Sequence, residues 1–383
     1  MDYYQIEEFY SAEQILVRDS IRGFVKSEIS PVIDKFAQAH QEIPDLMKKL
    51  GAIGALGPFI PQKYAGAGLD QISYGLIMQE LESGDSAIRS AASVQSSLVM
   101  FPIYKFGSED QRQKFLPGLA SGHLIGAFGL TEPNHGSDPA SMETKIVRDG
   151  NGFRLSGAKM WITNAPICDL AVVWARDEDK KIRGVIVERS FEGFSTPETH
   201  NKWSLRASKT GELVFDQVYI PEENVLPEVN SMRGPLSCLN SARYGISWGA
   251  IGAAVDCYET ALQYAKERKQ FGKPIASYQL QQKKLAEMVT EITKAQLLSW
   301  RLGLLKNEDR ATPAQISMAK RNNVNMALEV AREARQILGA MGIVGDYPIM
   351  RHMMNLESVI TYEGTHDVHL LITGNDITGI NAF

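Results

Sequence analysis

The chain has 383 residues, of which 44% are hydrophobic and 22% are charged, a composition that excludes disordered, collagen-like and small disulfide-rich proteins. At roughly 150 residues per domain, this length predicts two or three domains. The 40 basic and 45 acidic residues give a formal net charge of −5, which argues against a nucleic-acid-binding protein because such proteins usually carry a basic face.

Three further features predict a cytoplasmic protein. The cysteines Cys168, Cys238 and Cys257 lie far apart and form no CxxC pair, which argues against a structural zinc site and suits a reducing compartment. The segment 1–8 is acidic and lacks the basic and apolar regions of a signal peptide. No run of about 18 apolar residues occurs, so we expect no membrane-spanning segment.

The first third of the sequence is predicted to be helical. Apolar residues recur at three- and four-residue spacing over 12–33, 44–51 and 72–81, which indicates amphipathic helices. Ser83-Gly84-Asp85-Ser86 interrupts this pattern and supplies an N-cap for another helix. We expect a further short helix over 109–116.

The middle third changes to short runs of β-forming residues. Such runs occupy 170–175, 185–187, 213–215 and 218–220, and Asp216-Gln217 separates the last two. Asp149-Gly150-Asn151-Gly152 is a strong turn signal. Short strands at this spacing predict a small β-sandwich or barrel.

The last third is predicted to be helical again over 239–267, 278–305 and 313–341, and the Gly and Ala content of the first stretch favours close helix packing. The sequence therefore predicts an α+β protein with an N-terminal all-α domain (1–127), a middle β domain (128–232) and a C-terminal all-α domain of four helices (233–383).

Two stretches of the middle third combine residues that suit ligand binding. The first, FGLTEPNHGSD from Phe128, has glycines that let backbone N–H groups approach a flat or anionic ligand. A tight loop with Asx-type turns explains the same residues without a ligand, and is the simpler interpretation of this stretch alone. The second, MWITN from Met160, places an indole beside a hydroxyl that could form the wall of a ring-binding site. An ordinary strand with a core tryptophan is again the simpler interpretation.

A third stretch, TYEGTHDVH from Thr361, holds a carboxylate and two histidines. A solvated loop carboxylate is the default interpretation of Glu363. His366 and His369 are three residues apart, a spacing that can ligate a metal on a helix, but nothing else in the sequence supplies a clear third ligand. We therefore expect no metal site here.

The three stretches, together with ARYGISWG from Ala242 and ERKQFGKPI from Glu267, occur in an order and spacing that resembles the acyl-CoA dehydrogenases over nearly the whole chain. Arg89-Ser90 and the segment 93–100 favour the glutaryl-CoA dehydrogenase branch. The resemblance implies an N-terminal helical domain, a middle β domain and a C-terminal four-helix domain. It also implies FAD bound between the β domain and the C-terminal helices.

The resemblance implies two groups of FAD-binding residues. Those near the flavin are Phe128, Leu130, Thr131, Ser137, Trp161, Ile162, Thr163 and Thr365. Those near the adenosine and pyrophosphate are Arg268, Phe271, Gln279, Gln336, Gly339 and Ala340. In this family the second group comes from a neighbouring subunit, which implies a homotetramer.

The resemblance also assigns the catalytic and acyl-CoA-binding residues. Glu363 matches the family's catalytic base, and Ala242 stands where some relatives carry the base instead, so Glu363 has no rival. The residues implied to bind acyl-CoA are Glu82, Arg89, Ser90, Ser93, Ser137, Leu239, Asn240, Arg243, Tyr244, Tyr362 and Gly364. The reaction implied is the α,β-dehydrogenation of glutaryl-CoA with decarboxylation to crotonyl-CoA and CO2, in lysine and tryptophan degradation. Electrons would pass to an electron-transfer flavoprotein.

Several alternatives remain open at this point. Arg89 is the only charged residue between Asp85 and Lys105, and it could bind a substrate carboxylate or simply pair with Glu82 or Asp85. The enzyme could act on another short acyl-CoA, leave glutaryl-CoA undecarboxylated, or pass electrons to O2 as an oxidase. A non-enzymatic relative is the remaining class. Leu338-Gly339-Ala340-Met341-Gly342 and His135 depart from the usual family pattern.

Overall fold

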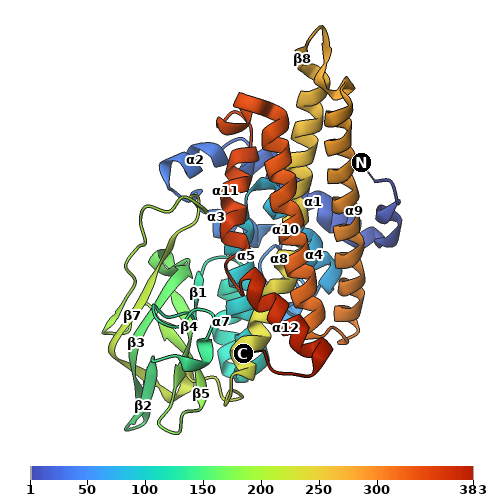
Figure 1. The fold of residues 1–383 in the computed structure, drawn as a ribbon. Coiled ribbons are helices and arrows are strands. Elements are labelled where there is room, and N and C mark those ends of the chain that lie inside the picture. The colour runs from blue at the N-terminus through green and yellow to red at the C-terminus, as the bar shows by residue number, and fades with distance from the viewer. Residues whose placement is uncertain (1, 383) are drawn as a thin grey trace.

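The computed structural model describes residues 2–382, which form an α+β architecture of three consecutive parts (Figure 1). Helices make up the first part, strands the second and long helices the third. The helices are α1 (Ala12–Phe24), α2 (Ile33–Ala39), α3 (Leu46–Ala52), α4 (Gln71–Gly84), α5 (Ser86–Ser93), α6 (Phe101–Phe106), α7 (Glu109–Ala120), α8 (Arg233–Glu267), α9 (Gln279–Asn307), α10 (Pro313–Leu338), α11 (Ile349–Val359) and α12 (His366–Thr378). None of the described helices combines the length and apolarity needed to cross a bilayer.

The N-terminal helices follow the predicted pattern with one interruption. Ser11 starts α1 with a capping box that it shares with Gln14. The helix continues through a π-helical turn at Val25–Ile29, and the chain bends before α2. Helix was therefore correctly predicted from residue 12, but the prediction of one helix to residue 33 was wrong. The break at 83–86 is confirmed, because the Asp85 side chain accepts a hydrogen bond from the Ala87 N–H at the start of α5.

The middle part is one curled sheet of seven strands in the order β1-β4-β2-β3-β7-β6, with β5 paired to β4. Its strands are β1 (Gly126–Gly129), β2 (Lys145–Asp149), β3 (Gly152–Thr163), β4 (Leu170–Arg176), β5 (Ile182–Glu188), β6 (Phe194–Ser195) and β7 (Thr210–Pro221). Both faces of β4 are buried, each against a different part of the protein. Leu170, Val172 and Trp174 pack against the N-terminal helices, whereas the alternate residues pack inside the curled sheet. This two-sided burial explains the unbroken apolar run at 170–175.

The two strands predicted on either side of Asp216-Gln217 are one strand, β7. Pairing with β3 shifts register at this point, so that Leu155 lies opposite Val218 while Gly157 lies opposite Phe215. Gln217 has a positive φ of 52°, as expected where a β-bulge adds residues to one strand. The polar dipeptide marks this bulge and not a turn between two strands.

The C-terminal helices pack directly on the N-terminal ones. Helices α8, α9 and α10 contact one another, and α11 and α12 lie against α10. Helix α8 also crosses α4 closely, because glycines in α8 admit bulky partners. A Cβ on Gly245 would lie 2.6 Å from the Tyr74 hydroxyl, and a Cβ on Gly252 would collide with the Gln79 carbonyl. The predicted role of the glycines in close packing is confirmed.

Gly252→Ala is expected to destabilise the protein by about 1–3 kcal/mol, because the new methyl group would meet backbone atoms that cannot move aside easily. Gly374→Ala in α12 is the matched control, since nothing lies within 4 Å of its added Cβ, and it should be neutral or stabilising by about 1 kcal/mol. Chemical unfolding of both variants measures the difference. Equal stability of the two variants would contradict the packing argument.

Candidate active site

Glu363 lies in a tight loop between α11 and α12 whose backbone is held in an unusual conformation. Glu363 itself has a left-handed φ of 52°, and Gly364 follows with a φ of 95°. A Cβ on Gly364 would come within 3.0 Å of the His369 ring and 3.2 Å of an Arg243 nitrogen, so only glycine fits there. Thr365 caps α12 by accepting a hydrogen bond from the Val368 N–H at 3.2 Å.

Two cations from the long helices hold the carbonyl groups of this loop. Arg243 of α8 donates its Nε to the Glu363 carbonyl at 2.7 Å. Lys320 of α10 donates its Nζ to the carbonyls of Tyr362 at 3.0 Å and Gly364 at 2.9 Å. Three successive carbonyl groups are thereby fixed, and the left-handed Glu363 is stabilised by these contacts.

The Glu363 carboxylate differs from a solvated loop carboxylate. The residue as a whole is half-buried, but its Oε2 is out of contact with solvent and has no hydrogen-bond partner among the described residues. Burial raises the pKa of Glu363, and the charges of Arg89, Arg243 and Lys320 oppose that rise. A carboxylate with one buried, unpaired oxygen and a raised pKa has the properties of a general base.

Arg89 is completely buried and is paired on its own side of the site. Its Nε lies 2.7 Å from Glu82 Oε2, and its Nη2 contacts the Tyr362 hydroxyl. Burial alone would lower the pKa of Arg89, but the nearby Glu82, Tyr362 and Glu363 together keep it raised. Asp85 is not its partner, because Asp85 pairs with Arg351 at 2.6 Å.

The helices α4 and α5, which carry this ion pair, also carry buried hydroxyl groups. Ser90 and Ser93 are buried on α5, and Ser93 Oγ has no hydrogen-bond partner in the described part of the chain. Tyr74 of α4 lies 2.7 Å from Ser97 Oγ, and Ser241 of α8 donates to the same oxygen at 3.2 Å. Arg89 thus contacts both of the other predicted residues Glu82 and Tyr362, and Glu82 Oε1 and Ser93 Oγ are buried without a partner among the described residues.

The residues predicted to line the acyl-CoA channel on α8 occupy different environments. Leu239 is buried, and Asn240 accepts a weak hydrogen bond from Arg243 Nη1 at 3.4 Å. Tyr244 is fully buried in the core between the helical parts, where its hydroxyl donates to the Gln71 carbonyl at 2.7 Å. Arg243 is therefore the α8 side chain that directly contacts the Glu363 loop.

Trp161 in strand β3 forms an exposed platform. Its backbone has a left-handed φ of 62°, and the pairing of β3 with β7 shifts register between Lys159 and Ile162. This irregularity turns the indole outward, so that it is 58% exposed while Ile162 is buried. A large exposed indole beside the half-buried Thr163 fits a planar aromatic ligand and does not fit a core tryptophan.

The loop 128–138 is tied to the same strand. Lys159 Nζ donates to the Leu130 carbonyl at 3.1 Å and to Glu132 Oε1 at 2.8 Å, and both side chains are buried. The Glu132 carboxylate also accepts hydrogen bonds from the backbone N–H groups of Glu143 and Thr144. Phe128 and Leu130 are buried, whereas Thr131 is half-buried and Ser137 is exposed. The first half of this loop is therefore buried and held by Lys159, whereas its second half, which includes Ser137, is exposed.

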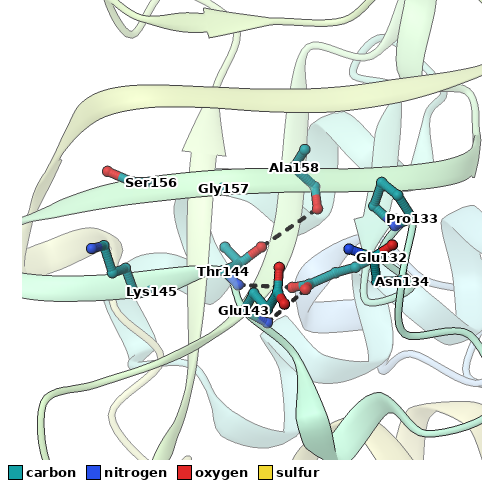
Figure 2. A pocket seen from close by; sticks show the side chains of 9 residues that line it. All are labelled: Glu132, Pro133, Asn134, Glu143, Thr144, Lys145, Ser156, Gly157 and Ala158. Carbon is teal, nitrogen blue, oxygen red and sulfur yellow. Dashed lines mark hydrogen bonds between the residues drawn. The ribbon is translucent and has the colours of Figure 1, made fainter.

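A hollow of about 330 Å³ lies beside this loop, between the loop and the strands β2 and β3 (Figure 2). Figure 2 shows the Glu132 carboxylate turned toward the backbone N–H groups of Glu143 and Thr144. His135 lies 3.5 Å from Glu143, so these three acidic and histidine side chains gather at one place. Because Lys159 already neutralises Glu132 and two backbone N–H groups donate to its oxygens, we infer no metal site from this cluster.

The residues predicted to bind adenosine and pyrophosphate gather at the other end of the long helices. Arg268 follows α8, Phe271 lies in the hairpin of β8 (Lys269–Gln270) and β9 (Lys273–Pro274), and Gln279 begins α9. Gln336, Gly339 and Ala340 lie at the end of α10, where Lys284 of α9 donates to Gln336 at 2.6 Å. All six are exposed, and Phe271 is 95% exposed. In Figure 1 this hairpin projects from the helices, far from β3, the strand to which Trp161 belongs.

The two histidines after Glu363 face cations. His369 is buried beneath Gly364, and burial together with the Lys320 and Arg243 charges lowers its pKa to about 3. Burial, followed by the charges of Lys320 and Arg321, also lowers the pKa of His366. Such positive surroundings disfavour a bound metal cation.

Sequence reasoning missed Lys320, which contacts the loop as closely as Arg243 does. A signal was present, because Lys320 falls on the apolar stripe of α10, four residues after Ile316 and four before Val324. A lysine on the buried face of a helix is rare unless it has a specific partner. Lys159, which lies opposite Glu132, was missed in the same way.

Comparison with known proteins identifies the family. The models for the N-terminal, middle and C-terminal domains of acyl-CoA dehydrogenases match residues 11–123, 127–218 and 232–378. A crystal structure of glutaryl-CoA dehydrogenase from Mycobacterium smegmatis is 49% identical, with a TM-score of 0.97 over 99% of this chain and 97% of that one. A second, in complex with FADH2, is 46% identical with a TM-score of 0.98 over 99% and 98%. The short-chain specific acyl-CoA dehydrogenase of Bos taurus mitochondria is 33% identical over 98% of this chain and 92% of its own length. The predicted three-part fold is confirmed, and the chain belongs to the acyl-CoA dehydrogenase family.

Proposed function

We propose that this acyl-CoA dehydrogenase is an FAD-dependent enzyme that oxidises glutaryl-CoA and releases crotonyl-CoA and CO2. The observation that carries the proposal is the buried Arg89, which contacts Tyr362, the neighbour of the base Glu363. A dicarboxylic thioester needs both a base at its α-carbon and a cation at its far end. The glutaryl-CoA dehydrogenases of Mycobacterium smegmatis, nearly half identical to this chain, support the same assignment.

Glu363 would remove the α-proton of the bound thioester. Its unpaired Oε2 has a free lone pair for that proton, and its backbone is held without any hydrogen bond that competes for this oxygen. FAD supplies the acceptor for the hydride that leaves the β-carbon. The loop 128–138, Trp161 and Thr163 would hold the flavin, and the open indole platform described above fits that role.

Arg89 would bind the distal carboxylate. A guanidinium has five N–H donors, and the contacts with Glu82 and Tyr362 use Nε and Nη2, so other donors remain for substrate. Ser93, with its unpaired hydroxyl, is a second donor for the carboxylate. After dehydrogenation the carboxylate is vinylogous to the thioester, so its C–C bond can break to release CO2. The electron pair then delocalises into the thioester, and a proton returned to the γ-carbon gives crotonyl-CoA.

The alternative is a dehydrogenase for a neutral short-chain acyl-CoA. Glu82 already neutralises Arg89, so the site does not need an anionic ligand to balance its charge. The Bos taurus short-chain enzyme is 33% identical to this chain. A non-decarboxylating glutaryl-CoA dehydrogenase would use the same base and the same arginine and would differ in its product.

The test is the colour of the protein. Purified protein should be yellow, and anaerobic glutaryl-CoA should bleach it faster than butyryl-CoA does. Product analysis should then find crotonyl-CoA and CO2 in equal amounts. Faster bleaching by butyryl-CoA would favour the neutral-chain alternative. Formation of glutaconyl-CoA without CO2 would favour the non-decarboxylating enzyme. Rapid formation of peroxide in air would favour an oxidase. Absence of bleaching by any acyl-CoA would contradict the proposal and favour a non-enzymatic relative. Electron-transfer flavoprotein is the acceptor to be tested first.

We also propose a homotetramer in which each FAD is bound by two subunits. The residues predicted to bind adenosine lie on the projecting hairpin and at the end of α10. Within one subunit these places are far from the sheet residues that are predicted to bind the flavin. We expect a tetrameric mass in light scattering, and dilution to monomer should release FAD. Phe271→Ser, at a 95% exposed position, should weaken assembly and FAD binding together. A monomer that retains one FAD per chain would contradict this proposal.

A further inference from the structure

We propose that Lys320 is a positioning residue that holds the base Glu363 through the two peptide carbonyls on either side of it. This inference rests on the proposed function, because it assigns Lys320 to the same proton-transfer site. Lys320 itself touches the backbone of the loop and is not proposed to touch the reacting atoms.

The placement of Lys320 calls for such a role. Lys320 is completely buried in α10, and among the described residues no carboxylate is hydrogen-bonded to its Nζ. Its hydrogen bonds go to the carbonyls of Tyr362 at 3.0 Å and Gly364 at 2.9 Å. A buried ammonium without a carboxylate partner is costly, and an apolar residue at this place in the stripe would avoid that cost. The hydrogen bonds from Lys320 to the loop carbonyls offset this cost.

The loop needs these contacts because it is held in a conformation that a glutamate rarely adopts. Glu363 has a φ of 52°, which crowds the Cβ of any residue other than glycine. Lys320 fixes the carbonyls before and after Glu363, and Arg243 fixes the carbonyl of Glu363 itself. Because all three contacts are made to the backbone, the Glu363 Oε2 has no partner within residues 2–382 and is free to accept a proton.

Lys320 also belongs to the charges that face Glu363. Arg89 comes from α5, Arg243 from α8, Lys320 from α10, and the Tyr74 and Tyr362 hydroxyls also face the carboxylate. The charge of Lys320 also acts on His366 and His369 of α12, whose pKa values it lowers. Burial raises the pKa of Glu363 and the three cations lower it. Burial also lowers the pKa of Lys320 to about 7, so its positive charge is present on the acidic side of neutrality, where it favours the ionised base.

The test compares Lys320→Met with wild type in anaerobic flavin bleaching over a series of pH values. Lys202→Met is the matched control, because Lys202 likewise fixes a loop through the Leu205 and Ser208 carbonyls, but in the middle domain. We expect Lys320→Met to remain yellow and to bleach about a hundredfold more slowly at saturating substrate, as for a misplaced base. The acid limb of its pH profile should move to higher pH, because loss of a cation leaves the effect of burial on Glu363 less opposed. Lys202→Met should keep the wild-type acid limb.

Each outcome distinguishes this inference from the proposed function. Bleaching of the wild type tests the function, and the ratio of variant to wild type tests Lys320. A wild-type rate and acid limb in Lys320→Met, or the same change in Lys202→Met, would overturn the inference. If Lys320→Met fails to fold, Lys320→Arg is the variant to test, since it keeps the positive charge and the N–H donors. A yellow, slowly bleaching Lys320→Arg protein with the wild-type acid limb would support the role of Lys320 in positioning Glu363. Failure of both variants to fold would make Lys320 a purely structural residue.

Discussion

Glu363→Gln is expected to give a folded, yellow protein that binds acyl-CoA but is bleached about a hundredfold to ten-thousand-fold more slowly than wild type, the usual range for loss of a general base. Glutamine keeps the size of the side chain and fits the same left-handed position, but its amide cannot take up a proton at neutral pH. No carboxylate stands at Ala242 to take over the role. Rapid anaerobic mixing with glutaryl-CoA measures the bleaching rate directly.

Glu357→Gln is the matched control for this experiment. Glu357 lies six residues before Glu363, on α11, and is half-exposed in a surface pair with Arg332 at 3.1 Å, so its loss should leave the bleaching rate unchanged. A rate near wild type in Glu363→Gln would show that another group takes the proton. Equal losses in the two variants would indicate a general effect of substitution near the loop.

The sequence allowed prediction of the residues of the site much better than of their geometry. Helices and apolar strands follow from local spacing, so 72–81 and 170–175 were predicted correctly. The motifs around Trp161 and Glu363 indicated the family, which the domain matches confirm. Helices α11 and α12 were not predicted as separate segments. Helix α12 gives no apolar stripe, because His369 is its one buried residue among those described, whereas α11 does have an apolar stripe that was overlooked.

The conformation of Glu363 could not be read from its own neighbours. Its left-handed backbone depends on Arg243, 120 residues away, and on Lys320 in another helix. The outward turn of Trp161 depends on a register shift against β7, which local propensity does not reveal. Similarly, the choice of Glu82 over Asp85 as partner of Arg89 depends on Arg351, which binds Asp85 from α11. Long-range partners decide each of these features.

Arg89→Met is expected to change the substrate preference of the enzyme. Leaving one member of a buried charge pair without its partner typically costs about 2–5 kcal/mol. At roughly 1.4 kcal/mol per tenfold, kcat/KM for glutaryl-CoA should fall about thirty-fold to a few thousand-fold. Butyryl-CoA has no distal carboxylate, so its kcat/KM should fall far less or even rise. The ratio of the two losses is the quantity to measure, because general damage to the fold affects both substrates.

The control must also remove a buried arginine, and Arg351→Met does so. Arg351 pairs with Asp34 at 2.7 Å and with Asp85 at 2.6 Å, and not with Tyr362 or Glu363. Its loss should therefore lower kcat/KM for glutaryl-CoA and for butyryl-CoA equally, or lower only the stability of the protein. Glu82 complicates the interpretation of Arg89→Met, since its carboxylate would be left buried without its cation. Arg89→Met combined with Glu82→Gln removes that charge, so any loss of butyryl-CoA oxidation caused by the unpaired Glu82 should be reversed while glutaryl-CoA oxidation stays low. If both substrates recover together, Arg89 serves the fold through Glu82, and the proposal that it selects a dicarboxylic substrate is wrong.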